Sequence, residues 1–208
     1  MSVNIKALFL DIGGVLLTNG WDHRMREKAA HIFDLDFLEM NTRHALTFDT
    51  YEIGKLSLDE YLKRVVFYEP RSFSLENFKD FMFSQSQPLG TMLELMKNIK
   101  KEHGLKVVGI SNEGRELMLN RIEKFKLKEL FDMFVCSCFV HLRKPDLEIY
   151  HMALDLAQVK PGQIIYIDDR SMLVEIGQQL GMQAFQHINE DRTKQTLEDL
   201  LKVTMTKG

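Results

Sequence analysis

Carboxylate side chains directly follow two of the most apolar runs in this 208-residue sequence. Asp11 comes after residues 5–10, and Asp168 and Asp169 come after residues 163–167. Two adjacent like charges at the end of a buried strand are costly unless a cation compensates them. Mg²⁺ held by one or two carboxylates, together with phosphate oxygens and waters, would supply that cation. These positions therefore point to a magnesium site and to phosphate chemistry.

A hydroxyl, an amide and an ammonium group follow two other apolar runs. Ser111 and Asn112 come after residues 106–110, and Lys144 lies beyond residues 133–136. In an open parallel sheet, ligands bind outside the carboxyl ends of the strands. We therefore expect these side chains to meet the three carboxylates at one edge of a sheet.

Each of these residues also has a purely structural interpretation. Asp11 at a strand end can simply cap the next helix, and Ser111 can do the same. Gly13 and Gly14 can form a tight turn, and a single lysine such as Lys144 is usually a solvated charge. The adjacent carboxylates are harder to explain in this way, and all these groups in this order favour a functional site.

Short apolar runs alternate with stretches of helical length over most of the chain. Continuous rather than alternating hydrophobicity is typical of strands that are covered on both faces of a parallel sheet. The five expected strands are residues 5–10, 106–110, 133–136, 163–167 and 183–186, and the expected helices between the later strands span about 113–126, 146–158 and 172–180. This alternation predicts an α/β fold with a doubly wound parallel sheet.

About a hundred residues separate the first two expected strands, far more than one crossover helix needs. Ser57 and Glu60 have the spacing of a capping box, and Ser74 can cap a further helix. Eight of the fourteen phenylalanines lie in this segment, enough apolar bulk for a small core. We therefore predict an inserted small α-helical domain at residues 18–86, and an α/β core domain made of residues 1–17 and 87–208.

The composition, 45% hydrophobic and 27% charged, is that of a globular protein. A net charge of −3 gives no broad attraction for nucleic acid or for an anionic membrane surface. No apolar stretch approaches the ~20 residues of a membrane helix, and no secretory signal is recognisable. Cys136 and Cys138, two residues apart in an expected strand, suit burial on one face better than a disulfide or zinc site. We expect a cytoplasmic protein that is a monomer or a weak homodimer.

These groups of residues resemble the four ordered motifs of the haloacid dehalogenase (HAD) superfamily. The motifs are residues 8–16, 110–112, 144–146 and 167–169, and the insert takes the place of the helical cap in subfamily I. The resemblance implies a Rossmann-like core with a mobile cap. It also implies a Mg²⁺-dependent phosphatase that works through an aspartyl-phosphate on a small phosphorylated metabolite, such as a sugar phosphate or a nucleotide.

The resemblance also implies roles at the metal. Asp11 resembles the nucleophile that attacks phosphorus in line. The implied Mg²⁺ ligands are Asp11, the main-chain carbonyl of Gly13, and Asp168. Asp169 is implied to lie behind these ligands, where it orients a water or Lys144.

On the phosphate side, the resemblance implies that Ser111, Asn112 and Gly14 bind the phosphoryl oxygens. Lys144 resembles the second catalytic residue of the family. It would add positive charge to the transition state and keep Asp11 ionised.

Two positions depart from the family pattern. HAD phosphatases usually carry a second Asp two residues after the nucleophile as general acid and base, and this position is Gly13 here. The sequence closely resembles a glucose-1-phosphatase-like branch with Gly at this place, although general acid–base catalysis is typically worth ~10²–10⁴-fold. Leu173 stands where related sequences often have Asn or Asp. The candidates left open for the proton carrier are Glu113, Asp169, Asp22, His23 and Glu52.

The insert should decide which substrate fits. Trp21 and Glu52 are possible substrate contacts, although burial in the core of the insert explains Trp21 equally well. A glycine in the loop at residues 51–54 would allow a close backbone approach to the site.

Two other functions are alternatives to a phosphatase. A 2-haloacid dehalogenase uses a similar aspartate without metal, but the pair Asp168 and Asp169 would repel its carboxylate substrate. A phosphate- or partner-binding module without catalysis is supported by Gly13 and Leu173, whereas the retained Asp11 argues against it.

Overall fold

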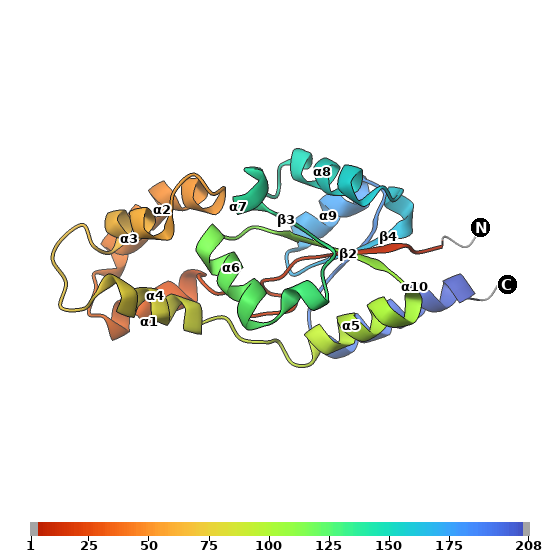
Figure 1. The fold of residues 1–208 in the computed structure, drawn as a ribbon, viewed down its shortest axis with the longest axis horizontal. Coiled ribbons are helices and arrows are strands. Elements are labelled where there is room, and N and C mark those ends of the chain that lie inside the picture. The colour runs from red at the N-terminus through yellow and green to blue at the C-terminus, as the bar shows by residue number, and fades with distance from the viewer. Residues whose placement is uncertain (1–3, 206–208) are drawn as a thin grey trace.

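The computed structural model describes residues 4–205 and consists of an α/β core with a group of helices at one end (Figure 1). Five parallel strands form one sheet in the order β3-β2-β1-β4-β5. The strands are β1 (Ala7–Leu10), β2 (Lys106–Ser111), β3 (Met133–Cys136), β4 (Ile164–Asp168) and β5 (Gln183–Gln186). All five predicted strands are present, which confirms the Rossmann-like α/β fold.

Helices cover both faces of the sheet. One face carries α5 (Met92–His103), α6 (Arg115–Lys124) and α10 (Glu190–Met205), and the other carries α8 (Leu147–Ala157) and α9 (Ser171–Gln179). Leu8 and Leu10 of β1 pack in the first layer, and Phe9 packs in the second. Because both faces of β1 are buried, its sequence is continuously apolar, as the strand prediction assumed.

The strand register brings the candidate residues to one edge. Leu10 at the end of β1 lies beside Gly109 of β2 and Ile167 of β4. The backbone N–H of Asp11 then donates to the Ile167 carbonyl (2.9 Å), which continues the ladder by one residue. The residues that follow β1, β2 and β4 therefore leave the sheet side by side.

The prediction for the two cysteines is wrong in one respect. Cys136 ends β3, but the chain turns directly into the short helix α7 (Ser137–Val140), which contains Cys138. The last pairing of the strand is between Cys136 and Ser111. Both thiols are buried and free, as expected.

Four helices lie between β1 and α5, within the predicted insert. They are α1 (His23–Ile32), α2 (Phe37–Glu52), α3 (Leu58–Val65) and α4 (Leu75–Ser84). The predicted capping box at Ser57 and Glu60 starts α3, and Ser74 caps α4. Their buried side chains form a hydrophobic cluster around Phe78. We propose that residues 18–86 form the cap. The first three and the last three residues of the chain lie outside the described range.

The two linkers between the core and the helices lie side by side. The Thr18 backbone N–H donates to the Gln87 carbonyl (2.8 Å), and the Thr18 hydroxyl donates to the Gln85 carbonyl (2.8 Å). Leu17 also forms a β-bridge with Pro88. The chain therefore enters and leaves the helical group at the same point.

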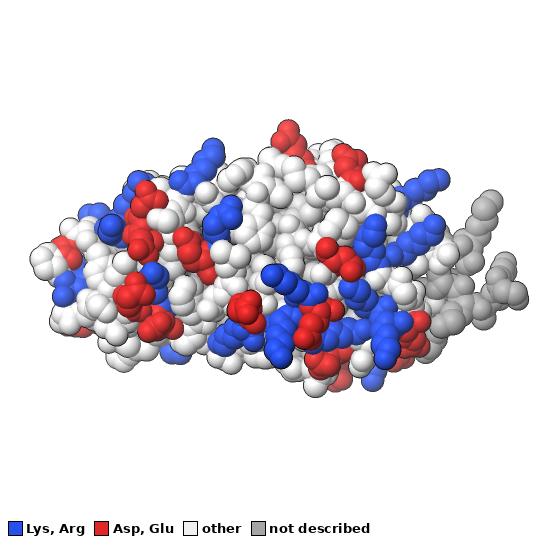
Figure 2. Space-filling model, in the orientation of Figure 1, with Lys and Arg blue, Asp and Glu red and all other residues white. Residues whose placement is uncertain are grey.

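Charges of both signs are mixed on the face seen in Figure 2. On α5, for example, Lys97 pairs with Glu129 (2.9 Å) and Lys100 pairs with Asp132 (2.7 Å). No helix among residues 4–205 is long and apolar enough to cross a membrane.

Candidate active site

A buried lysine joins two of the predicted carboxylates. Lys144 Nζ lies 3.0 Å from Asp11 Oδ2 and 2.6 Å from Asp168 Oδ2. The exposed fractions are 3% for Lys144, 8% for Asp11 and 0% for Asp168. Burial of a charge is costly unless it is paired and hydrogen-bonded, so this cluster requires the specific geometry that the three strand ends provide.

The two carboxylates differ in acidity because their partners differ. Burial raises the pKa of Asp11, and although Lys144 opposes this, the charge of Asp168 raises the pKa further. Burial would also raise the pKa of Asp168, but Lys144 and hydrogen bonds outweigh it, and the pKa falls below its usual value. The donors are Lys144, the Tyr166 hydroxyl (2.6 Å) and the Arg170 backbone N–H (2.9 Å). The charges of Asp11 and Asp168 outweigh the effect of burial on Lys144 and raise its pKa.

A third carboxylate completes a possible cation site. One oxygen each of Asp11, Asp168 and Asp169 lies within 4.8 Å of the others. Burial and the neighbouring Asp168 raise the pKa of Asp169. Three carboxylates against one ammonium leave an excess of negative charge, and hard oxygen donors of this kind suit Mg²⁺. The residues present therefore fit the implied metal.

Gly14 makes room for this group. Its backbone has φ = 75°, a conformation that favours glycine, and a Cβ atom there would overlap Asp169 Oδ2. Gly14 thus serves the packing of Asp169 against the turn after β1.

Ser111 and Asn112 use their side chains differently. The Ser111 hydroxyl is buried near Asp11 and acts to lower the pKa of that carboxyl group. The Asn112 amide donates to the Lys144 carbonyl (2.8 Å) and accepts from the Lys144 backbone N–H (2.8 Å). Asn112 therefore holds the loop that carries Lys144.

A small cavity of about 40 Å³ lies beside these groups. Its lining combines predicted site residues with others from the linker and the helices; the full set is Asp11, Gly13, Asn19, Ser111, Asn112, Glu113, Arg121, Lys144, Arg170 and Leu173. Asn19, Arg121 and Arg170 line the cavity although the sequence did not single them out as site residues. Leu173, one of the two departures from the family pattern, is buried and contributes an apolar wall.

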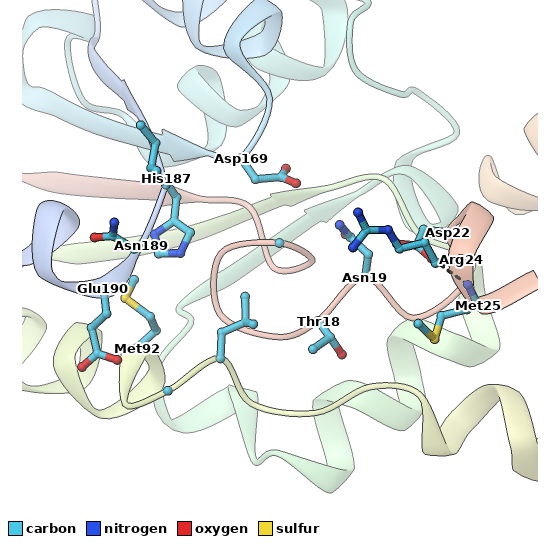
Figure 3. A pocket seen from close by; sticks show the side chains of 14 residues that line it. Thr18, Asn19, Asp22, Arg24, Met25, Met92, Asp169, His187, Asn189 and Glu190 are labelled. Carbon is cyan, nitrogen blue, oxygen red and sulfur yellow. Dashed lines mark hydrogen bonds between the residues drawn. The ribbon is translucent and has the colours of Figure 1, made fainter. Parts of the chain in front are cut away.

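A larger, open pocket of about 640 Å³ adjoins the cavity. Asn19 lines both spaces. Figure 3 shows Asp169 between two walls of the pocket. One wall carries His187, Asn189 and Glu190, and the other carries Asn19, Asp22 and Arg24.

Other predicted residues lie further from the cavity. Trp21 is buried in the helical group, where its indole N–H donates to the Tyr61 hydroxyl (2.8 Å) and its ring packs edge-to-face on Phe78. Asp22 caps α1 and accepts from the Met25 backbone N–H (2.9 Å). His23 lies on the surface of the same helix.

The end of α2 packs tightly on the core. Glu52 pairs with Arg143 (2.8 Å), and the Glu52 carbonyl accepts from the Ser137 hydroxyl (2.8 Å). The His141 ring donates to the Ile53 carbonyl (2.7 Å). Gly54 has φ = 74°, and a Cβ there would overlap the carbonyl of Cys138. The loop at residues 51–54 therefore approaches the core so closely that only glycine fits at position 54.

Glu52 should make the stability of the protein depend on pH. Burial raises the pKa of Glu52 to about 7 from its usual 4.5, despite Arg143. The folded protein then keeps a proton that the unfolded chain loses, so the free energy of unfolding should fall as pH rises from about 4.5 to about 7. In Glu52→Gln this fall should be smaller by on the order of 1–3 kcal/mol, measured by urea unfolding across that range.

The matched control is Glu39→Gln, which removes a more exposed carboxylate from the same helix. It should leave the pH dependence as in the wild type. An unchanged slope in Glu52→Gln would mean that Glu52 stays ionised beside Arg143 at all these pH values.

Comparison with known proteins places the chain in a family. The family model described as haloacid dehalogenase-like hydrolase matches residues 49–186. Flavin mononucleotide hydrolase 1 of Arabidopsis thaliana is 30% identical over 162 residues, which cover 77% of this chain and 64% of that protein, so the chain spans less than two thirds of this relative. D-ribitol-5-phosphate phosphatase of Bacteroides thetaiotaomicron is 25% identical over 210 residues, covering 95% of this chain and 98% of that protein.

The fold also matches solved structures. A HAD family enzyme from Bacteroides thetaiotaomicron, crystallised in complex with magnesium and inorganic phosphate, has a TM-score of 0.74 at 22% identity and covers 88% of this chain and 94% of its own. The match to the family model covers more than half of the chain. The chain belongs to the haloacid dehalogenase-like hydrolase family.

Proposed function

We propose that this chain is a Mg²⁺-dependent phosphatase that hydrolyses a small phosphorylated metabolite through an aspartyl-phosphate formed on Asp11. The observation that carries the proposal is the buried Lys144, held between Asp11 and Asp168 beside the third carboxylate of Asp169. Relatives named as phosphatases of D-ribitol 5-phosphate and as a flavin mononucleotide hydrolase support the same class of reaction.

Asp11 would attack phosphorus in line with the leaving oxygen. Lys144 favours the ionised, nucleophilic form of Asp11, and its charge also stabilises the negative charge that spreads over the phosphoryl oxygens. Ser111 would donate its hydroxyl to one of those oxygens. Asn112 acts indirectly, because it fixes the backbone of Lys144.

Asp11, Asp168 and the Gly13 carbonyl would hold the Mg²⁺, with Asp169 supporting them from the same group of carboxylates. When bound, the ion offsets the repulsion between the carboxylate and the phosphate. A metal-free dehalogenase is disfavoured, because three carboxylates beside one lysine would repel a carboxylate substrate. The low pKa of Asp168 keeps one ligand ionised at neutral pH.

The open pocket favours a hydroxylated leaving group, such as that of a sugar phosphate. Its polar side chains include Asn19, Asn189 and His187, which can exchange hydrogen bonds with hydroxyls. Among the described residues its lining holds no Phe, Tyr or Trp on which a nucleotide base or flavin ring could stack. Three acidic residues against one arginine also disfavour a leaving group with further phosphates.

The test is release of inorganic phosphate from a panel of sugar phosphates, nucleotides, flavin mononucleotide and an aryl phosphate. We expect release with Mg²⁺ and none with EDTA, and sugar phosphates should rank first. Asp168→Asn should reduce the rate by on the order of 10²-fold or more at fixed Mg²⁺, because it removes a metal ligand and a partner of Lys144.

Asp155→Asn is the control, since it makes the same change at an exposed position of α8. It should leave the rate unchanged. Wild-type protein that binds phosphate esters without ever releasing phosphate would instead favour the binding module that Gly13 and Leu173 left open.

A further inference from the structure

A buried ion pair lines the small cavity opposite the carboxylate cluster. Arg121 Nη1 lies 3.0 Å from Glu113 Oε2, and the exposed fractions are 1% for Arg121 and 6% for Glu113. Among the residues that line this cavity, Asp11 and Glu113 are the two that carry carboxylates. Glu113 therefore faces the same small space as the proposed nucleophile.

The pair reaches the backbone next to the nucleophile. A Cβ atom built on Gly13 would lie 3.4 Å from Arg121 Nη1 and 2.8 Å from Asn19 Oδ1. The absence of a side chain at Gly13 thus leaves room for Arg121 and Asn19 beside Asp11. A buried ion pair often adds little stability over apolar packing, so its presence here calls for another explanation.

The other acidic side chains weighed as proton carriers are occupied elsewhere. Asp22 caps α1 and Glu52 pairs with Arg143, and neither lines the cavity. Asp169 belongs to the group of carboxylates that suits the cation. Glu113 alone of these lies in the cavity and outside that group.

We propose that Glu113 is the general acid and base of the reaction, and that Arg121 positions it. This inference rests on the proposed phosphatase function. As the bond from Asp11 Oδ to phosphorus forms and the ester P–O bond breaks, Glu113 gives its proton to the leaving alkoxide, which departs as an alcohol. The Glu113 carboxylate then takes a proton from the water whose oxygen attacks the aspartyl-phosphate, and phosphate leaves Asp11.

The surroundings of Glu113 agree with both halves of this cycle. Burial raises the pKa of Glu113, while Arg121 and the Gly114 backbone N–H oppose the rise. Arg121 is itself fixed on two further sides, by the Ser86 hydroxyl (3.0 Å) and the Thr18 carbonyl (3.3 Å). These contacts hold the guanidinium, and with it Glu113, at a defined place beside Asp11.

The test compares two esters in single-turnover cleavage with enzyme in excess. One is a sugar phosphate, whose alkoxide needs a proton to leave, and the other is p-nitrophenyl phosphate, whose phenolate leaves without one. Glu113→Gln should slow cleavage of the sugar phosphate by ~10²–10⁴-fold and that of the aryl ester far less. If both rates fall by the same factor, or neither falls, Glu113 is not the proton donor.

Glu116→Gln is the matched control, because Glu116 lies three residues further on, in the first turn of α6, and accepts from the Leu58 backbone N–H instead of lining the cavity. It should change both rates by one factor. If thermal unfolding shows that Glu113→Gln is not folded, Glu113→Asp replaces it in the same comparison. Glu113→Asp must then also slow cleavage of the sugar phosphate more than cleavage of the aryl ester. If the wild-type protein cleaves neither ester, the proposed phosphatase function is wrong. This outcome differs from an equal fall of both cleavage rates in Glu113→Gln, which would exclude only the role of Glu113.

Discussion

Replacing Asp11 with asparagine should reduce phosphate release by on the order of 10⁴–10⁶-fold, the scale of loss when a covalent nucleophile is removed. Asparagine has nearly the same shape, but its amide cannot form the aspartyl-phosphate. The rate is measured with the best substrate of the panel at saturating Mg²⁺. Retained turnover would show that another group attacks phosphorus.

The stability of Asp11→Asn separates chemistry from folding. Burial and Asp168 raise the pKa of Asp11, so its ionisation opposes folding above the usual carboxyl pKa. The neutral amide removes this cost at neutral pH. The melting temperature of the variant without Mg²⁺ should therefore equal or exceed that of the wild type, and a lower value would mean that the Lys144 contact stabilises the fold.

Above the pKa of Glu113, Arg121→Met should lower the free energy of unfolding by about 3–5 kcal/mol, because it leaves the buried carboxylate of Glu113 without its partner. It also removes the hydrogen bonds from α6 to Ser86 and Thr18 in the two linkers. Urea unfolding monitored by circular dichroism measures the change.

Two further variants serve as controls for the effect of Arg121→Met on stability. Arg121→Met combined with Glu113→Leu removes both charges and should recover much of the lost stability. Arg43→Met breaks a surface pair with Glu39 and should cost about 1 kcal/mol or less. A small effect of Arg121→Met alone above the pKa of Glu113 would mean that the ion pair adds little stability over apolar packing.

The strands, and the polar residues at their carboxyl ends, could be predicted because each sequence pattern involves only neighbouring residues. Each buried strand is continuously apolar, and Asp11, Ser111 and Asp168 come at or directly after its end. In a parallel sheet the carboxyl ends of the strands lie at one edge, so these residues could be expected to meet there. The capping residues Ser57 and Ser74 likewise act within three residues of their own helices.

The remaining site residues depend on contacts between distant parts of the chain. Arg121 in the middle of α6 has the sequence appearance of a solvated helix charge, but its partners Ser86 and Thr18 are 35 and 103 residues away. Trp21 sits next to a linker, yet it packs inward because Tyr61, 40 residues on, accepts its indole N–H. Asn112 follows its strand as predicted, but holds Lys144 across 32 residues of sequence.

The adjacency of the two linkers has a consequence for how this protein can diverge. Leu17 bridges Pro88 and Thr18 bonds to Gln87, so a short turn between these points would close the core without stretching it. A segment whose ends meet can be lengthened, shortened or exchanged at little cost to the fold that carries it. If residues 18–86 act as the cap that we propose, substrate preference can change by replacement of that segment, while the sheet edge with Asp11 and Lys144 keeps its geometry.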